Sequence, residues 1–117
     1  MQRPRAVTII SWLFIIFGSI ALLSGLWPYV RMTGPQLIVD LKSHWMIHLS
    51  RILQIIGGVF MLYGRNWARC LIVVWILFHI VISALHSIGF LLMHVVIFSV
   101  ILYFLFRPDA NAYFRRA

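Results

Sequence analysis

The sequence has almost no acidic residues and few charges of either sign. Asp40 and Asp109 are the only acids, charged residues make up 10% of the 117 positions, and hydrophobic residues make up 63%. A soluble domain of this length cannot hide so much apolar surface from water, because its surface is large relative to its volume. The composition therefore predicts a single all-α domain embedded in a membrane.

Several kinds of chemistry lack the residues that they need. Cys70 is the only cysteine, so the sequence offers neither an internal disulfide nor a cysteine metal site. It also has no phosphate-binding loop, nucleophile motif or paired catalytic carboxylates, and we therefore expect no enzymatic activity. Neither acid lies within an apolar run, which disfavours carriers coupled to protons or sodium, because these usually have carboxylates inside the membrane.

The net charge of +8 favours lipid over nucleic acid as a partner. The ten lysines and arginines are scattered singly or in pairs, mostly at the ends of apolar runs. A nucleic-acid groove would instead need a basic patch with exposed aromatic residues between the charges. We therefore expect no nucleic-acid binding, and we expect the charges to meet anionic lipid headgroups.

Four apolar runs are long enough to cross a bilayer as helices. They cover residues 6–27, 45–63, 67–87 and 90–106, with an outer loop at 28–44 and a tail at 107–117. The last run is short, about 25 Å by helical rise, which snorkelling of the flanking residues tolerates. We therefore expect one transmembrane domain over residues 1–117, an integral membrane four-helix bundle of antiparallel transmembrane helices.

Basic residues in the connections predict the orientation of the chain. One side carries seven arginines, namely Arg3, Arg5, Arg65, Arg69, Arg107, Arg115 and Arg116. The other side carries only Arg31 and Lys42, so the positive-inside rule places both termini in the cytoplasm. We expect a multi-pass protein of the cell membrane, most simply a bacterial inner membrane. The tail is either an interfacial segment anchored by Tyr113 and Phe114 or a frayed terminus.

Small residues recur every seven positions in the first two runs. They are Ser11, Gly18 and Gly25 in the first, and Ser50, Gly57 and Gly64 in the second. Small residues on one helix face let two helices approach closely inside a membrane. In an antiparallel hairpin the depths match if Ser11 meets Gly64, Gly18 meets Gly57 and Gly25 meets Ser50. This match favours a retained first helix over a signal peptide cleaved after Ser19-Ile20-Ala21, although the same face could serve dimerisation.

Polar residues inside the apolar runs are the candidate ligand-binding site, because polar groups are costly in a bilayer. They are His48, Arg51, Gln54, His79, Ser83, His86 and His94, with His44 one turn before His48. They predict a pocket that opens outward between the second, third and fourth helices. Its imidazoles could hold a metal or a b-type haem, a quinone is a further candidate, and Arg51 could hold an anion or a lipid phosphate.

A simpler interpretation of these polar residues needs no ligand. Histidines near the membrane surface can face headgroups, Arg51 can snorkel along its own helix, and His79 can bond to a neighbouring backbone. His44 and His48 have the spacing of a zinc site, but no acid or thiol accompanies them.

Two short motifs carry a resemblance to known proteins. Gly64-Arg65-Asn66-Trp67-Ala68-Arg69 follows the second run, and Leu105-Phe106-Arg107-Pro108-Asp109-Ala110 precedes Tyr113-Phe114. The chain resembles small bacterial four-helix inner-membrane proteins of unknown function, which imply the general plan and no activity. Our leading hypothesis is an accessory or structural subunit that binds other membrane helices. The alternatives are a ligand-binding membrane protein and, third, a small-solute transporter that acts as an oligomer.

Overall fold

The computed structural model describes residues 2–115, and every regular element in that range is helical. The elements are α1 (Arg5–Leu26), the 3-10 helix η1 (Trp27–Arg31), α2 (Pro35–Leu62), α3 (Asn66–His86), α4 (Ile88–Leu105) and α5 (Pro108–Arg115). Four helices, α1 continued by η1, α2, α3 and α4, are long and apolar enough to cross a membrane. The predicted all-α class and the four candidate membrane helices are therefore confirmed.

Helix α2 begins at Pro35, well before the apolar run expected from residue 45. Pro35 occupies the first turn, where a missing N–H costs no hydrogen bond, and Gly34 before it has a positive φ of 65°. Asp40 and Lys42 lie just before the apolar run, but α2 includes both residues. Most of the loop expected at 28–44 is therefore helical. The 28 residues of α2 span about 42 Å, more than the roughly 30 Å of a hydrocarbon core.

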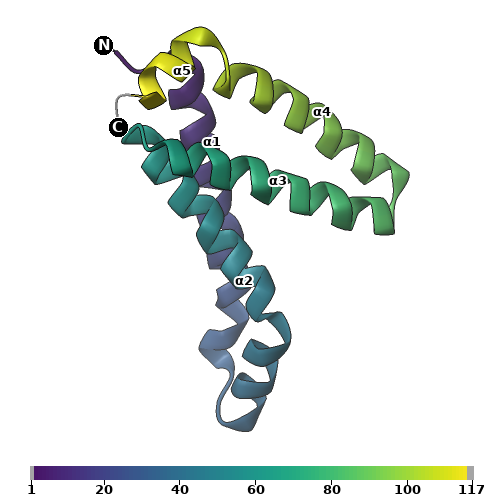
Figure 1. Cartoon of the computed structure of the whole chain (residues 1–117). Helices are drawn as coiled ribbons and strands as arrows, with labels where there is room; N and C mark the ends of the chain where they lie inside the picture. Colours follow the sequence, from purple (N-terminus) through teal and green to yellow (C-terminus); the bar gives the residue numbers. More distant parts are fainter. Residues whose placement is uncertain (1, 116–117) are drawn as a thin grey trace.

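The membrane helices form two hairpins that diverge from a shared corner (Figure 1). Helix α1 packs along α2 and helix α3 along α4, whereas the two hairpins meet mainly where α2 contacts α3. The Cα atoms extend over 51 × 32 × 18 Å, and the smallest of these lengths is less than two helix diameters. The described chain is therefore flatter and more open than the bundle expected from the sequence.

The core lies at this corner, where α5 and the near ends of the four long helices meet. The apolar side chains with no exposed area are Val7, Met61, Ala68, Ile72, Leu105, Ala110 and Phe114. None of them comes from the outer half of a hairpin, so the corner holds the packed interior. The outer arms are left with large apolar side chains on their surfaces, as expected where the surrounding medium is lipid.

Both ends of the described chain are tied to the turn between α2 and α3. Gly64 ends α2 with a φ of 74°, a left-handed conformation that glycine adopts without strain. The carbonyl oxygen of Leu62, left free at the end of α2, accepts hydrogen bonds from the Arg3 guanidinium at 2.9 Å and the Tyr113 hydroxyl at 2.6 Å. These two bonds hold the N-terminal segment and α5 against the same turn.

The tail expected at 107–117 contains a short packed helix. Ala110 and Phe114 of α5 are fully buried against the core, whereas Arg115 is exposed. Arg116, counted among the cytoplasmic arginines, lies outside the described residues. The amphipathic sequence of α5 thus packs its apolar side onto the protein instead of fraying.

The expected pairing of small residues between the first two helices is wrong in register. A Cβ atom on Gly58 would lie 2.8 Å from the carbonyl oxygen of Ser11, so Gly58, and not Gly57, is the close-contact glycine facing α1. Gly18 likewise faces Ile55, and not Gly57. A Cβ atom added to Gly18 would lie 2.9 Å from the Cγ1 of Ile55. Neighbouring residues of a helix point about 100° apart, so moving one residue along α2 changes the partner helix.

The remaining small residues of α2 and its turn serve other partners. Gly57 faces Ile72 of α3, and the carbonyl and hydroxyl oxygens of Ser50 both accept from the Trp75 indole N–H at 2.9 Å. Gly64 lies under the ring of Tyr113, and Gly25 of α1 lies under the guanidinium of Arg51 instead of Ser50. All these residues permit close approach, but those on α2 divide between α1 and α3 and do not form one stripe.

Candidate functional site

The structure divides the predicted polar cluster between the two hairpins. His48, Arg51 and Gln54 lie on α2 in the first hairpin, whereas His79, Ser83, His86 and His94 lie on α3 and α4 in the second. The outer ends of the two hairpins point away from each other (Figure 1), and His48 and His86 belong to different hairpins. The single outward pocket between the second, third and fourth helices is therefore not formed as expected.

A cavity of about 510 Å³ lies instead between α2 and α3, and we call it the notch. It is lined by Ala21, Met46, Ile47, Ser50, Arg51, Gln54, Trp75, Phe78, His79 and Ile82. Three predicted site residues, Arg51, Gln54 and His79, thus meet around one space, while α4 contributes nothing to it. The amide of Gln54 is already used, because its Nε2 donates to the carbonyl oxygen of Phe14 at 3.2 Å.

Arg51 is the polar residue of the notch whose charge is not compensated. Its guanidinium lies against Gly25 of α1, where a Cβ atom would overlap Nη1. Within residues 2–115 the Arg51 side chain forms neither a hydrogen bond nor an ion pair, although arginine carries five N–H donors. A cation in this position attracts an anion or an oxygen acceptor supplied from outside the described chain.

Arg51 also lines a second, more polar cavity at the outer end of the first hairpin. This outer pocket has a volume of about 220 Å³ and is lined by Gly25, Pro28, Tyr29, Asp40, His44, Ile47, His48 and Arg51. Tyr29 and His48 share a hydrogen bond of 3.0 Å from hydroxyl to Nε2, with their rings edge to face at 5.4 Å. The Nδ1 of His48 is buried and has no partner among the described residues.

Tyr29 is a site residue that the sequence analysis missed. The Trp27-Pro28-Tyr29 stretch indicated only the end of a helix and a membrane interface. In the structure the short helix η1 turns the chain so that Tyr29 faces α2, 19 residues ahead. The only signal in the sequence for the contact between Tyr29 and His48 is Pro28, because a proline turns the chain just before Tyr29.

In the second hairpin, His79 and His94 face each other across α3 and α4. Their ring centroids are 6.3 Å apart with planes 21° from parallel, and Ser83 Oγ lies 3.1 Å from the Nδ1 of His94. In His79 and His94 the Nδ1 lies 2.9 Å and 2.7 Å from the carbonyl oxygens of Trp75 and Phe90. A carbonyl oxygen only accepts, so in each ring the Nδ1 carries a proton and donates it to the carbonyl oxygen.

His44 and His86 lie on the surface of the described chain. His86 and His44 each contact the carbonyl oxygen four residues earlier, and both are exposed. Across residues 2–115, no group of three or more histidine, cysteine, aspartate or glutamate side chains is placed to hold a metal ion. His79 and His94 are the two histidines whose rings face each other, so they are the candidate pair of nitrogen ligands for a metal or a haem.

Arg69 is a second residue whose role the sequence did not reveal. It was counted only as a topology determinant, yet it is 8% exposed and lies inside the corner. Its guanidinium donates to the carbonyl oxygen of Leu105 and to the side-chain oxygens of Asn66 and Asn111 at 3.1, 2.5 and 2.6 Å. It also lies over the ring of Phe106 at 4.3 Å. Arg69 is therefore a structural cation, unlike Arg51.

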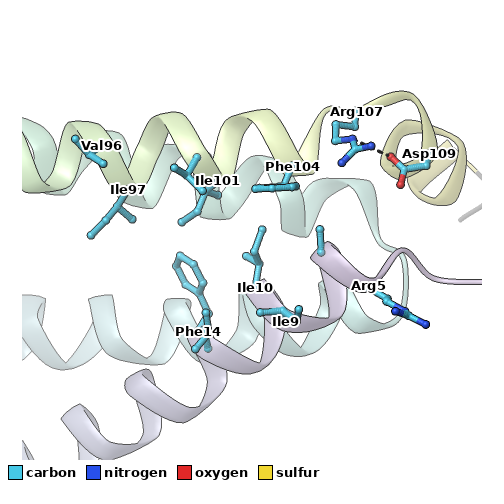
Figure 2. Close-up of a pocket in the computed structure, with 13 residues that line it drawn as sticks. Arg5, Ile9, Ile10, Phe14, Val96, Ile97, Ile101, Phe104, Arg107 and Asp109 are labelled. Carbon is cyan, nitrogen blue, oxygen red and sulfur yellow. Dashed lines mark ion pairs between the residues drawn. The ribbon is translucent and has the colours of Figure 1, made fainter.

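An apolar cavity whose shape suits a chain-like ligand lies between α1 and α4, and we call it the groove. Its volume is about 650 Å³, and it is lined by Arg5, Ala6, Ile9, Ile10, Leu13, Phe14, Val96, Ile97, Val100, Ile101, Phe104, Arg107 and Asp109. Figure 2 shows the polar side chains Arg5, Arg107 and Asp109 at one end and apolar side chains along the rest. The groove shares no residue with the notch.

No protein-family model, curated protein or solved structure matches this chain.

Proposed function

We propose that the protein is an accessory or structural subunit of a membrane complex, and that its notch receives a transmembrane helix of another subunit or of a second copy. The proposal includes the orientation given by the arginines, with both termini cytoplasmic and the four helices crossing a bacterial inner membrane. It assigns no catalytic role to the chain.

The uncompensated Arg51 in the open notch is the observation that carries the proposal. Ionisable residues within membrane helices almost always face other helices, because exposure to lipid is costly. Arg51 and His79 line a cavity that the described chain leaves open between its two hairpins. A helix seated there would cover both side chains and could offer Arg51 a carboxylate, a hydroxyl or a backbone carbonyl as acceptor.

The direct test is the particle mass of the protein purified in a mild detergent. The wild type is expected to retain a second copy or a defined partner, and Arg51→Met is expected to lose it without losing helical content. Arg65→Met is the matched control, because Arg65 is an exposed arginine outside the notch. A monomeric wild-type particle, or equal loss in both variants, would count against the proposal.

The arrangement of His79 and His94 favours ligand binding as the second candidate function. In both rings Nδ1 is the nitrogen that bonds to a backbone carbonyl, which leaves Nε2 as the nitrogen for a ligand, and imidazole nitrogens are common ligands of haem iron and of metals. An absorption spectrum of the purified protein, with elemental analysis, tests this directly. A Soret band lost in His79→Ala and in His94→Ala would promote it, whereas no band and no metal would remove the haem and metal versions.

A further inference from the structure

The groove has the length of one lipid leaflet. It follows α1 from Arg5 to Phe14, which is about 13.5 Å of helix at 1.5 Å per residue. Half of a hydrocarbon core of roughly 30 Å is about 15 Å. An acyl chain that enters at the arginine end would therefore run along the groove to about the middle of the bilayer.

The walls of the groove suit a hydrocarbon chain and leave no polar group along it. Between its two ends the lining consists only of aliphatic and phenylalanine side chains from α1 and α4. Ile9, Leu13 and Val100 are exposed where the helices diverge, and Figure 2 shows side chains of both helices facing the space between them. Transfer of one methylene group from water to an apolar site is favourable by about 0.8 kcal/mol, but an acyl chain in a bilayer is already out of water. Selectivity for one kind of lipid must therefore come from the polar end of the groove.

The polar end of the groove suits a phosphate. Arg5 and Arg107 flank this end, at the level where the arginine count places the cytoplasmic headgroups. Arg107 has one ion pair, to Asp109 at 3.8 Å, and both partners are substantially exposed, so the pair is weak and open to competition. Within residues 2–115 the Arg5 side chain has no hydrogen bond, which leaves its fork of donors available for phosphate oxygens.

We propose that the groove is a binding site for one anionic phospholipid of the cytoplasmic leaflet. One acyl chain lies between α1 and α4, and Arg5 and Arg107 contact the phosphate and the anionic headgroup. Basic recesses between membrane helices on the cytoplasmic side are the general form of such sites. This site is independent of the helix-binding notch, because the two cavities have no residue in common.

The test uses native mass spectrometry of the full-length protein with matched amounts of dioleoyl phosphatidylglycerol and dioleoyl phosphatidylcholine. The wild type is expected to retain one phosphatidylglycerol with about tenfold preference, a size typical of one to two arginines near a membrane surface. The double variant Arg5→Gln/Arg107→Gln is expected to lose that preference. Arg65→Gln, an exposed arginine at the same corner but outside the groove, is expected to keep it.

A second pair of variants tests the apolar part of the groove. Ile97→Trp fills the groove from α4 and is expected to abolish retention of both lipids, whereas Val81→Trp on the exposed surface of α3 is expected to change nothing. Circular dichroism verifies that each variant is folded. Equal retention of both lipids by the wild type, or retention unaffected by Ile97→Trp, would show a non-specific lipid shell and overturn the proposal. Displacement of bound lipid by a second protein chain at the groove would also overturn it, and none of these three results bears on the notch.

Discussion

The guanidinium of Arg69 at the start of α3 donates to the side-chain oxygen of Asn111 in α5, at a distance of 2.6 Å. The same guanidinium reaches the carbonyl oxygen of Leu105 at the end of α4, so one cation joins three helices. The aromatic rings of Phe106 and Phe114 lie on it at 4.3 and 4.8 Å. Arg69 thus holds together the corner from which both hairpins diverge.

Replacement of Arg69 is expected to destabilise the whole fold. Arg69→Met should lower the free energy of unfolding by about 3 kcal/mol, because hydrogen bonds to a charged donor contribute about 1.5–3 kcal/mol each and the buried carbonyl oxygen of Leu105 would lose its bond to Arg69. Unfolding in mixed micelles with increasing denaturing detergent measures the difference. Arg65→Met removes an exposed arginine from the same corner and should change the free energy by less than about 0.5 kcal/mol. Equal losses in the two variants would contradict the role given to Arg69.

Gly57 and Gly58 are expected to respond differently to the same substitution. In Gly58→Ala the new methyl group would lie 2.8 Å from the backbone carbonyl oxygen of Ser11, and a backbone cannot move aside cheaply. In Gly57→Ala it would meet only side-chain atoms, the Cδ1 and Cγ1 of the buried Ile72, and the nearest backbone atom would lie 3.8 Å away. Alanine also gains about 1 kcal/mol of helix propensity over glycine. Gly58→Ala should therefore cost about 1–3 kcal/mol of unfolding free energy, and Gly57→Ala should cost less, because a side chain yields more readily than a backbone.

The same unfolding assay distinguishes this structure from the pairing expected from the sequence. A larger loss in Gly57→Ala than in Gly58→Ala would place Gly57 against α1 and reject the register of α2 described above.

The bond from Trp75 to Ser50 is expected to stabilise the contact between the two hairpins. Trp75→Phe removes the indole N–H that donates to both oxygens of Ser50, and it should cost about 1–2 kcal/mol including the lost ring area. Ser50→Ala removes only the hydroxyl, while the carbonyl oxygen still accepts, so its cost should be smaller. Hydrogen exchange of α3 amides measures this local opening. Equal exchange in the two variants would show that the backbone acceptor contributes nothing.

The sequence predicts where this chain is helical more reliably than where each helix begins. The turn at Gly64 and the short connection at Ser87 were found because glycine and serine interrupt long apolar runs. The start of α2 at Pro35 was missed, because Asp40 and Lys42 lower the hydropathy of its first ten residues. The apolar run therefore begins only at residue 45. Hydropathy reports the burial of side chains in an apolar medium, whereas helix formation depends on backbone hydrogen bonds.

The candidate site could be predicted by residue type but not by arrangement. Arg51, Gln54 and His79 were chosen because polar groups are rare in apolar helices, and the notch does bring them together. The separation of His48 from His86 depends on the angle between two hairpins, for which one sequence contains no signal. Tyr29 and Arg69 were missed for a related reason, since His48 lies 19 residues from Tyr29, and Leu105 and Asn111 lie 36 and 42 residues from Arg69.

The proposed orientation makes a prediction that can be checked in intact cells with single cysteines. In a Cys70→Ser background, Thr33→Cys and Ser87→Cys lie in the two connections far from the corner and should react with a membrane-impermeant maleimide. Asp109→Cys lies at the arginine-rich corner and should react only after the membrane is permeabilised, because seven arginines against Arg31 and Lys42 favour a cytoplasmic corner. Labelling of Asp109→Cys in intact cells would reverse the orientation, and it would move Arg5, Arg107 and the phospholipid groove to the outer leaflet.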